Sequence, residues 1–192
     1  FRGHVMATLE GHAFIASSLD GFIARTDHEI DWLNKQPLDG DDHGYEAFVA
    51  RMDGVILGRH SFRKVRSFPE WPYKKPVVVL SRTLTQDDIP APLRRDDRVR
   101  IAGTSPSRLA ATLAAEGWRR AYIDGGATIQ SFLRAGLLNE ITITQVPILL
   151  GAGRRLFGPL EEDIDLELRE VRSYRSGLVA TRYRVLPSAP EL

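Results

Sequence analysis

The stretch Ala121-Tyr122-Ile123-Asp124-Gly125-Gly126-Ala127-Thr128-Ile129-Gln130 combines an apolar strand, two adjacent glycines and the start of a helix. Paired glycines let the backbone come close to a ligand, because neither residue carries a side chain. The first amide groups of the following helix attract an anion. The stretch therefore predicts either a phosphate-binding turn or an ordinary tight turn, and it favours an α/β sheet with buried strands.

Two other apolar strands end in polar residues. Val55-Ile56-Leu57 runs into Gly58-Arg59-His60-Ser61-Phe62, and Val77-Val78-Val79-Leu80 runs into Ser81-Arg82. Arginine binds phosphate oxygens through paired donors, so these strand ends suit a phosphate monoester at the edge of the sheet. Taken singly, the first segment is also typical of an ordinary capped helix start, and the second is also typical of a loop.

The remaining pattern predicts one domain over residues 6–187 with a mixed sheet. The final strands, Leu166–Tyr174 and Leu178–Val185, are joined by the turn Ser176-Gly177 and predict an antiparallel hairpin. Other strands are expected at His12–Ser18, Val99–Ala102 and Glu140–Leu149, and helices at His43–Met52, Ser61–Val65, Pro106–Glu116 and Thr128–Arg134. Pro69–Pro76 and Asp87–Pro92 are expected to be loops. Met6 looks like a natural start, so residues 1–5 are expected to be a remnant of the expression vector. Residues 188–192 are expected to form a disordered tail.

The composition excludes several classes of function. The 192 residues are 43% hydrophobic and include no cysteine, which fits an ordinary soluble domain and excludes disulfide frameworks, thiolate metal sites and a cysteine nucleophile. A net charge of +1 gives no general attraction for nucleic acid. No apolar run approaches the roughly 18 residues of a membrane span, so we expect a cytoplasmic protein with no membrane partner.

Familiar catalytic motifs are also missing. The chain has neither a G-x-G-x-x-G after a strand nor a P-loop, and no serine has G-x-S-x-G surroundings. The histidines lack the spacing of metal ligands, so we expect no metal site. Hydrolase chemistry therefore has no support in the sequence.

Taken together and in chain order, the three strand ends resemble the NADPH-contacting segments of dihydrofolate reductases. The stretches Phe14-Ile15-Ala16-Ser17-Ser18-Leu19-Asp20-Gly21-Phe22-Ile23-Ala24, Asp31-Trp32-Leu33 and Val146-Pro147-Ile148-Leu149-Leu150-Gly151-Ala152-Gly153-Arg154-Arg155-Leu156-Phe157 look like the branch that includes the reductase domain of riboflavin biosynthesis. The resemblance covers roughly residues 12 to 186. It is specific as a set, whereas each motif alone is weak.

The resemblance implies a three-layer α/β/α fold whose central sheet is mixed and mostly parallel, with a C-terminal antiparallel hairpin. It implies NADPH as cofactor and a homodimer as the assembly. The start of the family's cofactor helix matches Gly58, Arg59, His60 and Ser61, and the segment at the 2′-phosphate matches Ser81 and Arg82. The pyrophosphate turn matches Gly125, Gly126, Ala127 and Thr128, and the contact with the nicotinamide amide matches Ala16.

Hydride transfer usually needs a proton donor, and a carboxyl group in a partly apolar cleft suits that role because burial raises its pKa. The catalytic candidates are Asp20, which the resemblance places beside substrate and cofactor but which also suits a plain turn, and Asp31. The candidates for substrate contact are Trp32, Asp42, Tyr45 and Glu46. Trp32 would be either an aromatic wall or a core residue, and Asp42 either the family's helix acid or part of a hydrated loop. Tyr45 and Glu46 would lie on a helix that either lines the cleft or faces solvent.

The sequence thus predicts an NADPH-dependent reductase of a small planar heterocycle, of pteridine or ribosylamino-pyrimidine type, similar to 5-amino-6-(5-phosphoribosylamino)uracil reductase. A dihydrofolate reductase is disfavoured, since the Pro-Trp pattern that usually follows the first strand is absent. The complete riboflavin enzyme usually carries a zinc deaminase with His and Cys ligands, and this chain has no cysteine. The alternative from another class is a non-catalytic sensor that binds NADPH or a flat ligand.

Overall fold

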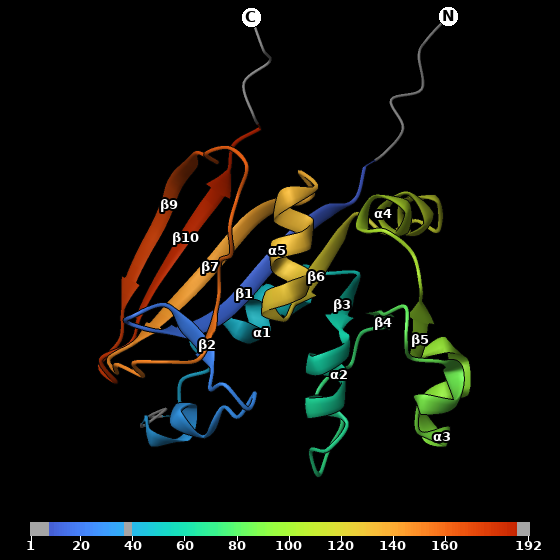
Figure 1. Cartoon of the computed structure of the whole chain (residues 1–192), viewed down its shortest axis with the longest axis horizontal. Coiled ribbons are helices and arrows are strands. Elements are labelled where there is room, and N and C mark those ends of the chain that lie inside the picture. The colour runs from blue at the N-terminus through green and yellow to red at the C-terminus, as the bar shows by residue number, and fades with distance from the viewer. Residues whose placement is uncertain (1–7, 37–39, 188–192) are drawn as a thin grey trace, which may run out of the picture.

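The structure is built around an eight-stranded sheet with the strand order β5-β4-β3-β6-β1-β7-β10-β9 (Figure 1). It is a computed structural model that describes residues 8–36 and 40–187, so the expected remnant and tail lie outside the described residues. Parallel pairing joins β1 (Glu10–Ser18), β3 (Gly54–Gly58), β4 (Val77–Leu80), β5 (Val99–Ala102), β6 (Arg120–Asp124) and β7 (Leu138–Val146). The hairpin of β9 (Leu166–Ser173) and β10 (Val179–Val185) pairs antiparallel through β10 with β7. The predicted mixed sheet is confirmed.

Helices cover both faces of this sheet. On one face α4 (Pro106–Ala115) and α5 (Gly126–Arg134) bury apolar side chains such as Leu113 and Phe132. On the other face α1 (Tyr45–Ala50) and α2 (Arg59–Val65) bury Phe48 and Phe62. This gives the expected three-layer arrangement. No helix within the described residues has the length and apolar character needed to cross a bilayer.

Several local predictions need correction. The segment predicted as a loop at Asp87–Pro92 holds a short 3₁₀ helix, Gln86–Asp88, and the start of α3 (Ala91–Arg94), because Thr85 and Asp88 form a capping box there. The strand predicted to reach Leu149 ends at Val146, where the next residue, Pro147, has no N–H to donate. A small second sheet of β2 (Phe22–Ala24) and β8 (Arg154–Arg155) was not predicted.

The connections place a binding cleft at a defined edge of the sheet. β3 and β6 are neighbours, yet α2, which follows β3, packs on one face and α5, which follows β6, packs on the other. The two helices therefore diverge from adjacent strand ends. In open α/β sheets ligands bind at such a switch point, beyond the carboxyl ends of the strands.

Candidate active site

A cleft at this switch point brings the three predicted strand ends together. Its cavity of about 410 Å³ is bounded by the ends of β3 and β4 and by the start of α5. The lining residues are Gly58, Arg59, His60, Leu80, Ser81, Arg82, Thr83, Ala127, Thr128 and Ser131. Segments that are far apart in the chain thus form one surface, which is hereafter called the strand-end cleft.

Glycines allow the two helix starts to approach each other. Gly125 has φ +95°, a conformation that favours glycine, and a Cβ at this position would collide with the Ser61 hydroxyl. A Cβ on Gly58 would lie 2.5 Å from Thr128 Oγ1. The beginnings of α2 and α5 are therefore in contact with no room for added side chains, and Gly125 and Gly126 are not among the residues that line the cleft.

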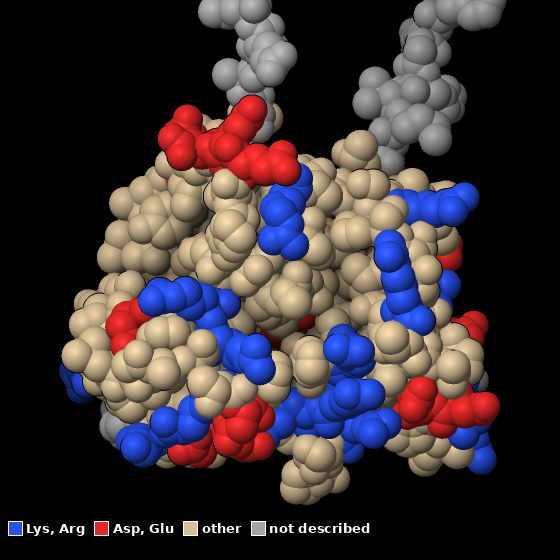
Figure 2. Space-filling model, in the orientation of Figure 1, with Lys and Arg blue, Asp and Glu red and all other residues tan. Residues whose placement is uncertain are grey.

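Basic groups surround the strand-end cleft. Arg59 Nη1 donates to Thr83 Oγ1 at 3.1 Å, and the exposed Arg82 lies on the rim. Burial, together with the adjacent His28 and Arg59, lowers the pKa of His60, so its imidazole is more readily neutral than a free one. Figure 2 shows further lysine and arginine side chains gathered on the face that carries α2. This charge suits an anionic ligand.

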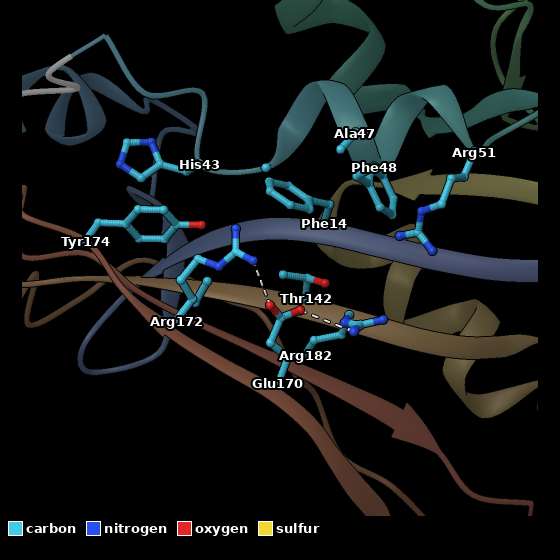
Figure 3. Close-up of a pocket in the computed structure, with 12 residues that line it drawn as sticks. Phe14, His43, Ala47, Phe48, Arg51, Thr142, Glu170, Arg172, Tyr174 and Arg182 are labelled. Carbon is cyan, nitrogen blue, oxygen red and sulfur yellow. Dashed lines mark hydrogen bonds and ion pairs between the residues drawn. The ribbon is translucent and has the colours of Figure 1, made fainter.

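A second cavity of about 260 Å³ lies between α1 and the strands β1, β7, β10 and β9 (Figure 3). It is hereafter called the α1 pocket. Its walls combine aromatic side chains with arginines, and small residues of α1 and β10 leave the space between them. The lining residues are Phe14, His43, Gly44, Ala47, Phe48, Arg51, Thr142, Glu170, Arg172, Tyr174, Ala180 and Arg182.

An aromatic cluster runs from the wall of the α1 pocket to Asp124. Phe14, in the pocket wall, contacts Tyr45 with ring centroids 5.8 Å apart, and the Tyr122 hydroxyl donates to the Phe14 carbonyl oxygen at 3.2 Å. Tyr122 in turn packs edge-on against Tyr73, whose hydroxyl donates to Asp124 Oδ2 at 2.7 Å. Asp124 immediately precedes the glycine turn, and it is not among the residues that line either cavity.

The environment of Asp124 raises its pKa. Burial is the main cause, and it outweighs the hydrogen bonds from Tyr73 and the Gly125 amide, which favour the ionised form. The same cluster raises the pKa of Tyr45 to about 12, through burial and the nearby Asp124. Sequence reasoning missed Asp124, although one signal was present: a carboxylate ends a wholly apolar strand directly before two glycines.

Asp20, the first catalytic candidate, has the opposite environment. Ser18 Oγ donates to Asp20 Oδ1 at 2.6 Å, and the amides of Leu150 and Gly151 donate at 3.1 and 2.8 Å. The hydrogen bond from Ser18 is the main cause that lowers the pKa of Asp20 to about 2. The carboxylate is therefore ionised at neutral pH and ties the turn after β1 to the loop after β7, and it has no proton to donate.

The Asp31-Trp32 pair does not form a substrate wall in this structure. Asp31 is exposed and accepts two hydrogen bonds from Arg25, at 2.6 and 3.0 Å, which lower its pKa. Trp32 is 0% exposed and packs with Val146 and Leu178. The core interpretation of Trp32 is therefore the correct one, because a fully enclosed indole presents no face to a ligand.

The other predicted substrate residues lie at or near α1. Asp42 is exposed and accepts hydrogen bonds from the amides of Gly44 and Glu46, which lower its pKa and fix the start of the helix. Glu46 faces solvent, whereas Tyr45 is half-buried in the aromatic cluster. Ala16 pairs with Thr144 of β7 and packs beside the Trp32 cluster.

Known proteins are similar to this chain along most of its length. The RibD C-terminal domain family matches residues 12–180. The uncharacterized protein YwjB of Bacillus subtilis (strain 168) is 32% identical over 163 residues, which are 84% of this chain and 90% of YwjB. A crystal structure of a candidate riboflavin biosynthesis protein from Shewanella sp. PV-4 superimposes with a TM-score of 0.86 at 39% identity, covering 93% of this chain and all of that one.

A more distant structure shares the fold alone. It is the diaminohydroxyphosphoribosylaminopyrimidine deaminase/5-amino-6-(5-phosphoribosylamino)uracil reductase of Thermotoga maritima, with 14% identity and a TM-score of 0.72. The likeness covers 93% of this chain and 57% of that one. The match of the family over most of the sequence, together with the YwjB relative, shows that the chain belongs to the RibD C-terminal domain family.

Proposed function

We propose that this chain is an NADPH-dependent reductase that transfers hydride to a small planar heterocycle. The observation that carries the proposal is the convergence of three strand ends on one cleft at the switch point of the sheet. Membership of a family whose structural neighbours include a named reductase supports the same reaction class.

The residues of the strand-end cleft fit a phosphorylated dinucleotide. Ala127 and Thr128 bring the first turn of α5 to the cleft, where its amides would suit a pyrophosphate, and Gly58 and Gly125 let this turn approach the start of α2. Arg59 and Arg82 offer guanidinium donors for a further phosphate, which favours NADPH over NADH. Bound there, NADPH would supply the hydride.

The α1 pocket would hold the reducible ring, and Asp124, which stands outside the pocket lining at the end of the aromatic cluster, would be the source of the proton. Phe14 and Phe48 present aromatic surface to a flat ligand. Asp124 keeps its proton to higher pH than Asp20 or Asp31, because burial raises its pKa whereas hydrogen bonds lower theirs. Tyr73 holds the Asp124 carboxyl group through Oδ2 and so fixes its orientation.

Two measurements test the function. Calorimetric titration should detect NADPH binding that is tighter than NADH binding. Incubation with NADPH and a panel of pteridine, pyrimidine and quinone acceptors should then consume the reduced nicotinamide, followed by its absorbance. Absence of NADPH binding would refute the proposal, and tight binding without oxidation by any acceptor would favour the sensor instead.

A further inference from the structure

The charged end of the α1 pocket contains more guanidinium groups than carboxylates. Arg172 and Arg182 project from the β9–β10 hairpin, and Arg51 projects from the residue that follows α1 (Figure 3). Glu170 Oε1 accepts a hydrogen bond from Arg172 at 2.9 Å, and Glu170 Oε2 lies 3.2 Å from Arg182 Nη2. Glu140, beside the pocket, pairs with Arg182 at 3.4 Å and with Arg51 at 3.9 Å. Three cations therefore share two anions.

One donor in this group has no acceptor. Arg182 Nε is buried and forms no hydrogen bond with any described residue. A buried donor without a partner is costly, and native structures usually satisfy such a group with protein, water or ligand. The neighbouring Glu140 Oε1 also has no hydrogen bond with a described residue, and it is Nη2 of Arg182 that pairs with Glu170, which lies between two arginines.

Size and walls restrict what can enter. The cavity of about 260 Å³ is smaller than the roughly 300–1,000 Å³ of ordinary small-molecule sites, which favours a compact ligand. Phe14 and Phe48, with ring centroids 5.1 Å apart, give it apolar walls under α1. The charged end and the aromatic end together suit a flat ring that carries one small anionic substituent.

We propose that the substrate of the α1 pocket is a compact planar ring bearing a carboxylate, and that Glu170 occupies the carboxylate's place between Arg172 and Arg182 until the substrate arrives. The side chain that now joins the two arginines is itself a carboxylate, so the same paired donors would accept a carboxylate from a ligand. The inference rests on the proposed function, in that this pocket is taken to hold the reducible ring. Glu170 is then a specificity-determining residue that competes with the ligand.

A matched pair of fluorescent probes tests the inference without turnover. Pterin-6-carboxylate and pterin share one bicyclic ring and differ by a carboxylate, and binding of each is followed by quenching of its fluorescence. The native protein should bind the carboxylated probe at least about tenfold more tightly, as expected for a charge-assisted contact. Equal affinity for the two probes, or no binding of either, would overturn the inference.

Variants separate the role of Arg182 from that of Glu170. Arg182→Gln should remove the preference for the carboxylated probe, whereas Arg184→Gln should keep it, because Arg184 lies on the same strand but outside the pocket and pairs with Glu167 at 3.8 Å. Glu170→Gln should bind the carboxylated probe about tenfold more tightly and pterin unchanged, since the competing charge is gone. Thermal unfolding checks that each variant is folded.

If Glu170→Gln weakened binding of the carboxylated probe, the competition would be disproved. The probe titrations need neither cofactor nor reaction, while NADPH titration reports on the strand-end cleft. A failure of the proposed reductase function is therefore distinguishable from a failure of this inference.

Discussion

Replacing Arg82 with alanine should weaken NADPH binding while leaving NADH binding nearly unchanged. Arg82 lies exposed on the rim of the strand-end cleft, and it makes no hydrogen bond or ion pair with any other described residue. Its removal should therefore cost the fold little. A hydrogen bond to a charged group is worth about 1.5–3 kcal/mol, and the exposure of Arg82 favours the lower value, which corresponds to about a tenfold increase in Kd.

Calorimetric titration of both nucleotides against native protein, Arg82→Ala and Arg108→Ala would measure this effect. Arg108 is a matched control, because it is an exposed arginine on α4 outside the cleft. The ratio of NADPH to NADH affinity should fall about tenfold in Arg82→Ala alone. If the two nucleotides lost equal affinity, Arg82 would have no role at the 2′-phosphate.

Four further outcomes are expected. Asp124→Asn should lower kcat about 10²- to 10⁴-fold. The rate of the native protein should fall as pH rises through the raised pKa of Asp124, and the pH–rate profile of the variant should lack this fall. A pH–rate profile unchanged by the substitution would exclude the proton-donor role. Asp20→Asn should reduce the loss of stability on acidification, because the folded pKa of about 2 lies below the unfolded value, so the contribution of Asp20 is present above the unfolded pKa and is lost as pH falls through the folded pKa. Urea unfolding at several pH values measures the loss, and a pH dependence equal to that of the native protein would argue against this role of Asp20. Gly58→Ala should cost about 1–3 kcal/mol in thermal unfolding because its Cβ meets Thr128 Oγ1, and adding Thr128→Ala should recover most of the loss. The expected homodimer should use the exposed apolar side chains of edge strand β9, so Val171→Lys should give a monomer in sedimentation whereas Leu149→Lys should not.

The fold was predictable because its signals are local. Ser105 caps α4 through the Arg108 amide, Pro106 occupies the first turn, and Gly117 follows the helix at φ +100°, as their sequence order indicated. The short apolar strands could be located from their composition alone. The β2–β8 pair could not, because two and three residues without alternation carry no strand signal and depend on the contact between distant loops.

The strand-end cleft was predictable for a different reason. In a parallel sheet all strands end at one edge, so polar residues that follow buried strands must gather there, whatever their distance in the chain. Gly58, Ser81 and Thr128 follow this rule. The α1 pocket does not, since it combines the middle of β1 with side chains of the C-terminal hairpin, and the register of β10 on β7 decides which arginines face it.

The two aspartates show why a proton donor cannot be read from a motif. Asp124 ends a strand and Asp20 lies two residues beyond one, and both precede glycine, so a local reading treats them alike. Their pKa values move in opposite directions, because Asp20 receives three donors from Ser18, Leu150 and Gly151, whereas at Asp124 burial outweighs the hydrogen bond from Tyr73. Burial is a property of the assembled sheet and not of the turn. The group suited to give a proton is therefore the one that the assembled sheet buries, and the sequence around it carries no sign of that burial.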